Sequence, residues 1–428
     1  MNSRQRVLCA LDHRQADRVP IDCGGTRQSG IAASTYHKLK QRLGLDTPTR
    51  VYDVYQMLAE IERPVMERFG ADCVGLQRPA VAFGIRNEGW KPWTMFDGTP
   101  VEVPAGFNPA PDDRGDLVLY DPAVEKGTGP ICRNGPQGAS HKLDLSPFPS
   151  PMARMPKGGF YFDRLDKYPG AAHADPEKLD LPLLSQEECD HLHARAEAYG
   201  QNTDFAVIAA MGPPFELFFG LGTGDFQAWM ITLATEPEYV DALLTRIVDA
   251  WLENLRRLAD AVGDRVQILQ FNDDLGTQQS PFLSARMFRE RIFPHYQRGL
   301  DWVHGNTRMK VFMHNDGAIA SFIPTLIEMG VDILNPVQTT AAGMDPVRLK
   351  REFGERIVFW GGACDCQHTL PFGTPEQVAQ EVRQSVRILG AGGGYVLAPV
   401  HNIQANVPPE NVIALFDAAA SCPACGGG

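Results

Sequence analysis

The sequence has no apolar stretch that approaches the roughly 20 residues of a membrane-spanning helix. Its opening, MNSRQRVLCALDHRQADRVP, carries scattered charges and lacks the apolar core of a secretory signal. A basic excess is also missing: the net charge is −12, whereas nucleic acids and anionic membranes attract positively charged surfaces. These absences predict a cytoplasmic enzyme with a small-molecule substrate and no nucleic-acid or membrane partner. A homodimer is compatible with the same composition.

The cysteines lack any repeating framework. There are nine, and an odd number in a cytoplasmic protein predicts reduced thiols rather than disulfides. Cys364 and Cys366 are one residue apart in GGACDCQ, and Cys422 and Cys425 form a CxxC near the end of the chain. No second pair or histidines accompany that CxxC at zinc-finger spacing, so we expect no structural zinc there.

One pattern recurs along the chain: a short apolar run, a polar or glycine-rich turn, and then a helical stretch. Six such units follow residue 200, with the runs FAVIAAM, VQILQF, MKVFM, VDILN, IVFW and YVLA. Two more begin earlier, at RVPID and DCVGLQ. Continuous apolar runs are typical of strands buried on both faces of a parallel sheet. Eight units predict a (β/α)8 barrel, and the absence of GxGxxG after the first run argues against a doubly wound sheet.

The pattern is interrupted over residues 90–183, which are rich in proline, glycine and aspartate. A structureless loop of this length is unusual inside a compact domain. We therefore expect one barrel domain over residues 1–428, with small hairpins inserted over 90–183 after the second strand. The inserted segment either covers the barrel mouth or decorates the surface.

Polar and titratable residues gather where the predicted strands end. In a barrel these positions share one rim, at which active sites form. The rim residues are Arg27, Gln28, Gln77, Asn272, Asp273, Asp274, His314, Asp316, Gln338, Cys364, Asp365, Cys366, His401 and Asn402. The strands themselves carry almost none, so we expect the rim to hold the active site.

His314 and Asp316 lie two residues apart, so at the end of an extended strand their side chains lie on the same side. With His401 from the last unit they form a three-ligand set suited to zinc or another divalent metal. Cys364 or Cys366 could add a fourth, softer ligand. The alternative is that both histidines contact substrate with no metal.

Asp273 and Asp274 are candidates for acid–base catalysis, because adjacent acids in a closed site can have separated pKa values. Neighbouring residues of an extended chain point in opposite directions, so we expect only one of the two to face the cavity.

Three blocks carry a family resemblance. VFMHNDGAIASFIPTLIEMGVDILNPVQ, MDPVRLKREFGERIVFWGG and GGGYVLAPVHNIQANVPPENVIALFDAA resemble the uroporphyrinogen decarboxylase superfamily in order and spacing. The resemblance is strongest over residues 265–420 and extends to DRVPIDCGGTRQSG near the N-terminus. It implies a (β/α)8 barrel, in agreement with the strand count.

The decarboxylases of that superfamily use no metal and hold an acidic tetrapyrrole through arginines and an aspartate. Arg27 and Gln28 match the start of their Arg-Gln segment, and His401 matches one of their histidines. Ile31 stands where a second arginine is expected, however, and DCVGLQRPA lacks the expected aspartate. The substrate's carboxylates and pyrrole nitrogens would both lose partners, so porphyrinogen fits poorly.

The other branch contains methylcobamide:thiol methyltransferases and corrinoid-dependent demethylases, which bind zinc through His-x-Cys and a later cysteine. This chain resembles them with His314 kept and with Asp316 and His401 in place of the cysteines. The resemblance implies a metal-dependent methyltransferase-like enzyme with zinc, a methyl-corrinoid co-substrate and a corrinoid protein as partner. Substrate contacts are expected from Arg27, Gln28, Gln77, Gln338 and Asn402. The alternative is a metal-free decarboxylase or lyase acting on a small carboxylate.

Overall fold

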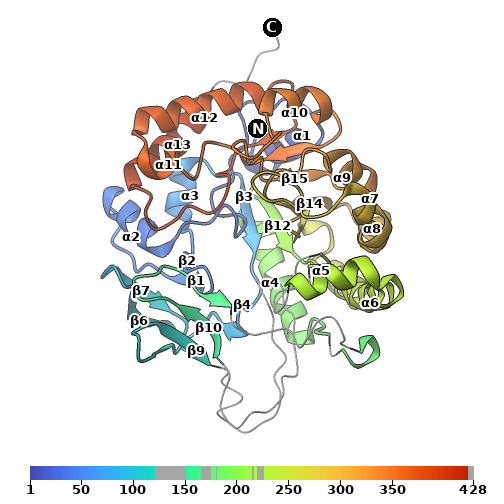
Figure 1. Ribbon diagram of the computed structural model, residues 1–428. Coiled ribbons are helices and arrows are strands. Elements are labelled where there is room, and N and C mark those ends of the chain that lie inside the picture. The colour runs from blue at the N-terminus through green and yellow to red at the C-terminus, as the bar shows by residue number, and fades with distance from the viewer. Residues whose placement is uncertain (121–150, 165–174, 180, 215, 219–225, 423–428) are drawn as a thin grey trace.

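The computed structural model describes residues 1–120, 151–164, 175–179, 181–214, 216–218 and 226–422. Its centre is a curled parallel sheet of seven strands surrounded by helices (Figure 1). In spatial order the strands are β17 (Tyr395–Val396), β16 (Val358–Trp360), β15 (Ile333–Asn335), β14 (Lys310–His314), β13 (Ile268–Asn272), β12 (Ala206–Ala210) and β3 (Cys73–Leu76). This order follows the chain, as expected when each parallel strand is joined to the next by a helical crossover.

Helices surround this sheet on its outside, except that α1 (Ser3–Leu11) packs against the cluster inside the barrel. The others are α2 (Ala33–Arg42), α3 (Arg63–Phe69), α4 (Gln186–Asn202), α5 (Phe226–Thr235), α6 (Pro237–Val262), α7 (Ala285–Arg291), α8 (Phe293–Asn306), α9 (Ile323–Met329), α10 (Pro346–Phe353), α11 (Thr369–Phe372), α12 (Pro375–Leu389) and α13 (Pro409–Ser421). Two short 3-10 helices, η2 (Pro176–Lys178) and η4 (Gly263–Arg265), complete the set. No helix in these described ranges is long and apolar enough to cross a bilayer.

The predicted first strand is reduced to one bridge that closes the barrel. Ile21 bridges Leu397 in parallel, beyond the end of β17. On its other side the carbonyl of Ile21 accepts a hydrogen bond of 2.8 Å from the backbone N–H of Asp72, next to β3. Pro20 has no N–H to extend the ladder. The predicted (β/α)8 architecture is therefore confirmed, with its first strand shorter than RVPID.

Two apolar layers show how the strand pattern is used. Ile268, Phe312, Ile333 and Val358 belong to a buried cluster inside the barrel, which includes residues of α1. Side chains that alternate with these, such as Val311, pack outward into the larger core beneath the helices. This alternation of neighbouring side chains explains why both faces of the sheet are apolar. It also places His314 on the inner side, two residues beyond Phe312.

Antiparallel strands fill the chain between β3 and α4. They are β4 (Ala80–Ala82), β5 (Ile85–Arg86), β6 (Lys91–Thr94), β7 (Pro100–Val103), β8 (Ala110–Pro111), β9 (Leu117–Tyr120), β10 (Pro151–Met155) and β11 (Asp163–Arg164). They lie together beside the hairpin of β1 (Val51–Asp53) and β2 (Leu58–Ala59) (Figure 1). The predicted insertion over 90–183 falls partly outside the described residues. The single-domain assignment of residues 1–428 stays a prediction.

A buried aspartate holds the closing segment in place. Asp72 is fully buried and accepts hydrogen bonds from Arg6 at 2.7 Å and Arg18 at 2.6 Å. Its second carboxylate oxygen also accepts the backbone N–H of Ile21 at 2.9 Å. Two guanidinium groups and a main-chain N–H thus converge on one carboxylate, so the seam of the barrel depends on it.

We predict that Asp72→Ala lowers the free energy of unfolding by about 3–5 kcal/mol, because Arg18 loses its carboxylate partner and Arg6 loses the buried one of its two. Asp17→Ala is the matched control, since Asp17 also pairs with Arg6 at 2.6 Å but its side chain is 44% exposed. It should cost less than about 1 kcal/mol. Denaturant unfolding measures both, and equal losses would contradict the role given to Asp72.

Two glycines of α8 provide a second test of the packing. A Cβ at Gly299 would lie 2.0 Å from the buried ring of Trp251 on α6, whereas one at Gly305 would meet nothing within 4 Å. Gly299→Ala should therefore lower the free energy of unfolding by about 1–3 kcal/mol through overpacking. Gly305→Ala should be neutral or stabilise by up to about 1 kcal/mol. Thermal and denaturant unfolding of the two variants measures the difference. Equal stabilities would contradict the close contact between α6 and α8.

Candidate metal centre

Three candidate ligands meet at the rim. His314 ends β14, Asp316 follows two residues later, and His401 lies in the loop after β17. Their nearest ligand atoms all lie within 4.8 Å of one another. Asp316 Oδ2 is 3.5 Å from His314 Nε2 and 4.0 Å from His401 Nε2. The structure therefore brings these three predicted residues together, and the group could hold a metal ion.

The turn that carries Asp316 requires a glycine. Gly317 has a φ of +93°, and a Cβ there would lie 2.5 Å from the backbone of Gly276 in the neighbouring loop. Its N–H donates to Gln338 Oε1 at 2.8 Å, and the N–H of Asp316 donates to Asp274 Oδ1 at 3.0 Å. A left-handed backbone and a close loop–loop approach both exclude larger residues. The position of the Asp316 carboxylate is thus fixed by three loops.

Each imidazole is oriented by an asparagine amide. Asn335 donates its Nδ2 to the carbonyl of Trp360 at 3.0 Å, so its Oδ1 faces His314 Nδ1 at 2.7 Å. Nδ1 must then carry a proton, so Nε2 is the nitrogen that faces Asp316 and that can bind a metal once it is deprotonated. His401 Nδ1 lies 3.0 Å from Asn402 Oδ1 in the same arrangement. An oxygen partner on the distal ring nitrogen is the usual support of a metal-bound histidine. The residues therefore fit a metal.

The electrostatics of the group favour positive charge. Burial opposes protonation of His314, but the charge and hydrogen bond of Asp316, together with Asp274, outweigh it and raise the pKa of His314 to about 9. Although burial alone would raise it, the charge of His314 keeps the pKa of Asp316 below its ordinary value. Burial raises the pKa of Asp274, with Asp316 adding to the effect. A divalent cation would supply the charge that these carboxylates attract.

The two adjacent aspartates point in opposite directions, as predicted for neighbours on an extended segment. Asp274 accepts the backbone N–H of Asp316 and lies beside the three candidate ligands. Asp273 is fully buried on the other side, where its Oδ2 accepts from Tyr296 at 2.6 Å and from the N–H of Phe218 at 2.7 Å. Asp273 therefore does not belong to the His–Asp–His group, and its predicted catalytic role stays a prediction.

Arg27 and Gln28 are both engaged by other residues. The guanidinium of Arg27 forms an ion pair with the fully buried Asp53 of β1. Gln28 is 5% exposed and accepts from Gln270 of β13 at 2.6 Å. Asp53 and Gln270 were missed by the sequence analysis. Gln270 could have been found from its inward register two residues before Asn272, but no local signal marks Asp53.

The remaining predicted contacts support the loops. Gln338 accepts the N–H of Gly317, and Asn402 orients His401 while donating to Gln56 at 2.9 Å. Both side chains are almost fully buried, at 6% and 2% exposure. Asn335 was not predicted, although it is a polar residue at the end of a strand, as His314 is. Gln77 lies in a separate pocket, described below.

The cysteines are outside the ligand group. Cys364 is buried in the core beneath the helices, and burial raises the pKa of its thiol well above the ordinary range. For Cys366, burial and then the charge of Asp316 raise the pKa to about 11. Cys366 is thus the thiol nearer to the site, but neither sulfur belongs to the cluster of ligand atoms formed by the described residues. The CxxC of Cys422 and Cys425 lies partly outside those residues.

Comparisons with known proteins bear on the same region. A family model described as uroporphyrinogen decarboxylase matches residues 164–422. A uroporphyrinogen decarboxylase of Alkalilimnicola ehrlichii is 24% identical over 270 residues, which cover 62% of this chain and 69% of that protein. One of Psychromonas ingrahamii is 25% identical over 185 residues, covering 43% and 48%. A solved structure, a methyltransferase from Methanosarcina mazei, matches with a TM-score of 0.55 at 17% identity and covers 98% of both chains. This last likeness shows the fold.

We predict that Asn335→Ala weakens zinc binding by about 10- to 100-fold, because His314 loses the oxygen that holds its ring and its proton. Asn306→Ala is the control, since Asn306 lies at the end of α8 and contacts only the carbonyl of Trp302. Competition with a chromogenic chelator measures the affinity. Equal affinities for both variants and wild type would contradict the role of Asn335.

Proposed function

This chain belongs to the uroporphyrinogen decarboxylase family, and we propose that it is a metal-dependent enzyme of that family that transfers or removes methyl groups. Zinc is the proposed metal, a methyl-corrinoid the proposed co-substrate, and a corrinoid protein the proposed partner. The observation that carries the proposal is the pair of imidazole Nε2 atoms turned toward Asp316 Oδ2 at 3.5 and 4.0 Å. Two histidines and one carboxylate are a ligand set that leaves positions open for substrate.

A bound zinc would polarise the substrate oxygen or sulfur from which, or to which, the methyl group moves. The chain's own residues would hold the reactants around it. His314 and His401 are kept in one tautomer by Asn335 and Asn402. Asp274 lies next to Asp316, and its proposed role is to exchange a proton with the substrate or to act as a further oxygen ligand. Arg27 and Gln28 are the proposed contacts for a polar part of the substrate.

One feature favours methyl transfer over porphyrinogen decarboxylation. Ile31 occupies the position at which a second arginine would be expected, and it is fully buried in a bridge with Ile403. Arg27 itself is already neutralised by Asp53. A substrate with several carboxylates would thus meet few free cations here. The methyltransferase fold match over nearly the whole chain is consistent with this proposal.

The second candidate is metal-free decarboxylation or lyase chemistry on a small carboxylate. It is supported by the relatives named uroporphyrinogen decarboxylase. In that case His314, Asp316 and His401 would bind substrate through hydrogen bonds, and the buried Asp274 beside them would handle the proton.

The proposal predicts that wild type holds one metal per chain, and that His314→Ala, Asp316→Ala and His401→Ala each lose it. Removing a direct ligand should weaken binding by more than the about 10- to 100-fold seen for supporting residues. His368→Ala is the matched control, because His368 pairs with Asp365 but its side chain is 79% exposed. Elemental analysis after dialysis measures the content.

Activity separates the two candidates. Methyl transfer to or from a cobalamin should disappear on chelation and return when zinc is added. Asp316→Cys should bind zinc more selectively, since thiolate is the softer ligand. The first candidate would be overturned if the wild-type protein held no stoichiometric metal and turned over a small carboxylate in the presence of a chelator. Those results would favour the second candidate.

A further inference from the structure

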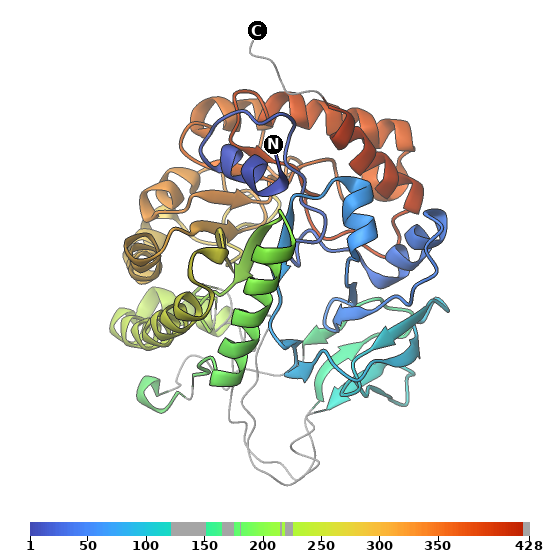
Figure 2. The same ribbon diagram turned by 180° about the vertical axis from the view of Figure 1, so that it is seen from behind.

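A second polar cavity lies on the outer wall of the barrel, away from the His–Asp–His group. It has a volume of about 360 Å³ and opens over β3, between Met66 of α3 and Arg195 of α4. Figure 2 shows these two helices on either side of the strand. Val74, which lines the cavity, belongs to the outer core and not to the cluster inside the barrel. None of the three candidate metal ligands lines it. The cavity is therefore separate from the His–Asp–His group.

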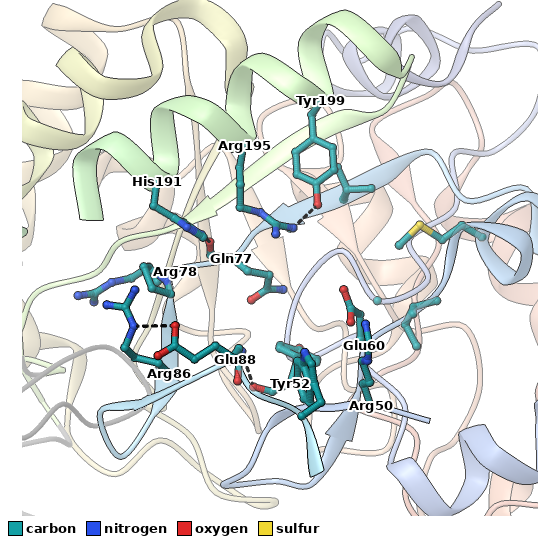
Figure 3. A pocket seen from close by; sticks show the side chains of 18 residues that line it. Arg50, Tyr52, Glu60, Gln77, Arg78, Arg86, Glu88, His191, Arg195 and Tyr199 are labelled. Carbon is teal, nitrogen blue, oxygen red and sulfur yellow. Dashed lines mark hydrogen bonds and ion pairs between the residues drawn. The ribbon is translucent and has the colours of Figure 1, made fainter. Parts of the chain in front are cut away.

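One face of α4 forms the upper wall in Figure 3. His191, Arg195 and Tyr199 are spaced four residues apart, so their side chains project from the same side of the helix. Arg195 donates to the hydroxyl of Tyr199 at 2.7 Å, and its guanidinium points into the cavity toward Gln77. The His191 ring lies 3.3 Å from the carbonyl of Gln77. Helical spacing thus presents one cation and two hydrogen-bonding groups to the cavity.

Arg195 differs from the other arginines of this wall. Arg50 pairs with Glu102 at 3.0 Å, Arg78 with Glu188 at 2.6 Å, and Arg86 with Glu187 at 2.8 Å. Arg195, in contrast, forms no ion pair with a carboxylate of the described residues; its Nε, like that of Arg78, is buried without an acceptor there. A partly buried charge without a counter-ion is costly. The same charge, after burial, lowers the pKa of His191.

The opposite wall suits a different chemical group. Glu60 and Glu88 lie on the side of the cavity away from Arg195 (Figure 3). Glu88 forms an ion pair with Arg86 at 3.3 Å, and the side chain of Glu60 is exposed to solvent. Tyr52 also lines this wall, and its hydroxyl is buried. The carboxylates could accept hydrogen bonds from the hydroxyl groups of a ligand whose anionic end lies at Arg195, and the phenol could donate or accept them.

We infer that this cavity binds a small organic anion, with its carboxylate or phosphate on Arg195 and Gln77 and its hydroxyl groups toward Glu60 and Glu88. The volume lies at the lower end of the roughly 300–1,000 Å³ of ligand sites, which suits a molecule of a few carbon atoms. An anion would supply the missing counter-charge in a site where water is partly excluded, and such bonds are among the stronger ones in proteins. The site does not depend on the proposed metal or on methyl transfer.

The test is calorimetric titration of metal-free protein with glycerol 3-phosphate and with glycerate. Their comparison distinguishes a phosphate from a carboxylate ligand, and inorganic phosphate and malonate serve as anions without hydroxyl groups. We expect saturable binding of at least one hydroxylated anion. The dissociation constant of that anion should rise by about tenfold or more in Arg195→Gln, because the variant loses one charge-assisted hydrogen bond. Arg308→Gln, which removes an exposed arginine on another surface, should leave it unchanged.

Two further measurements separate the sites and guard against misfolding. Asp316→Ala should bind the anion as wild type does, because Asp316 does not line the cavity. In wild type, the anion should protect Arg195 but not Arg308 from modification by phenylglyoxal, as read by peptide mapping. Absence of binding by all four anions, equal binding by Arg195→Gln, or equal modification of Arg195 with and without the anion would overturn the inference.

Discussion

The barrel is held closed by one buried carboxylate. Asp72 receives Arg6, Arg18 and the main chain of Ile21, so the segment before the Arg27 loop is fixed between β17 and β3. Main-chain pairing at this seam is short, because Ile21 with Leu397 and Ile31 with Ile403 form isolated bridges. Since β17 is aligned with that bridge through Leu397, the same closure sets where the following loop places His401. The rim site thus depends on an ion-pair cluster at some distance from it.

Amide side chains then decide what the rim histidines can do. Histidine offers two nitrogens, and which one is free depends on what the other contacts. Asn335, held by the carbonyl of Trp360, takes the proton-bearing nitrogen of His314, and Asn402 lies in the same position for His401. The free nitrogens therefore face one carboxylate. Without these asparagines, His314, Asp316 and His401 would still lie at the same rim, but their ligand atoms would not be directed to one point.

The arginines show the opposite use of charge. At the rim, Arg27 is neutralised by the buried Asp53, so it acts more as a fixed donor than as a free cation. On the outer wall, three arginines are neutralised by glutamates, whereas among the described residues the hydrogen bond of Arg195 goes to the hydroxyl of Tyr199. Burying such a charge costs free energy unless a counter-ion is present. The distribution of ion pairs, more than the number of arginines, distinguishes the rim site from the outer cavity.

The sequence by itself determined the features that depend on neighbours along the chain. Apolar runs separated by helical stretches predicted the barrel, and the alternation of an extended strand predicted that His314 and Asp316 share a side while Asp273 and Asp274 do not. Only the tertiary structure decided the rest. The partners of His314 and Gln28 are 21 and 242 residues away, Gln77 is directed to an outer cavity, and the thiols of Cys364 and Cys366 are not among the ligand atoms. Those outcomes depend on which loops meet when the barrel closes. The residues adjacent to each site in the sequence do not specify such long-range contacts.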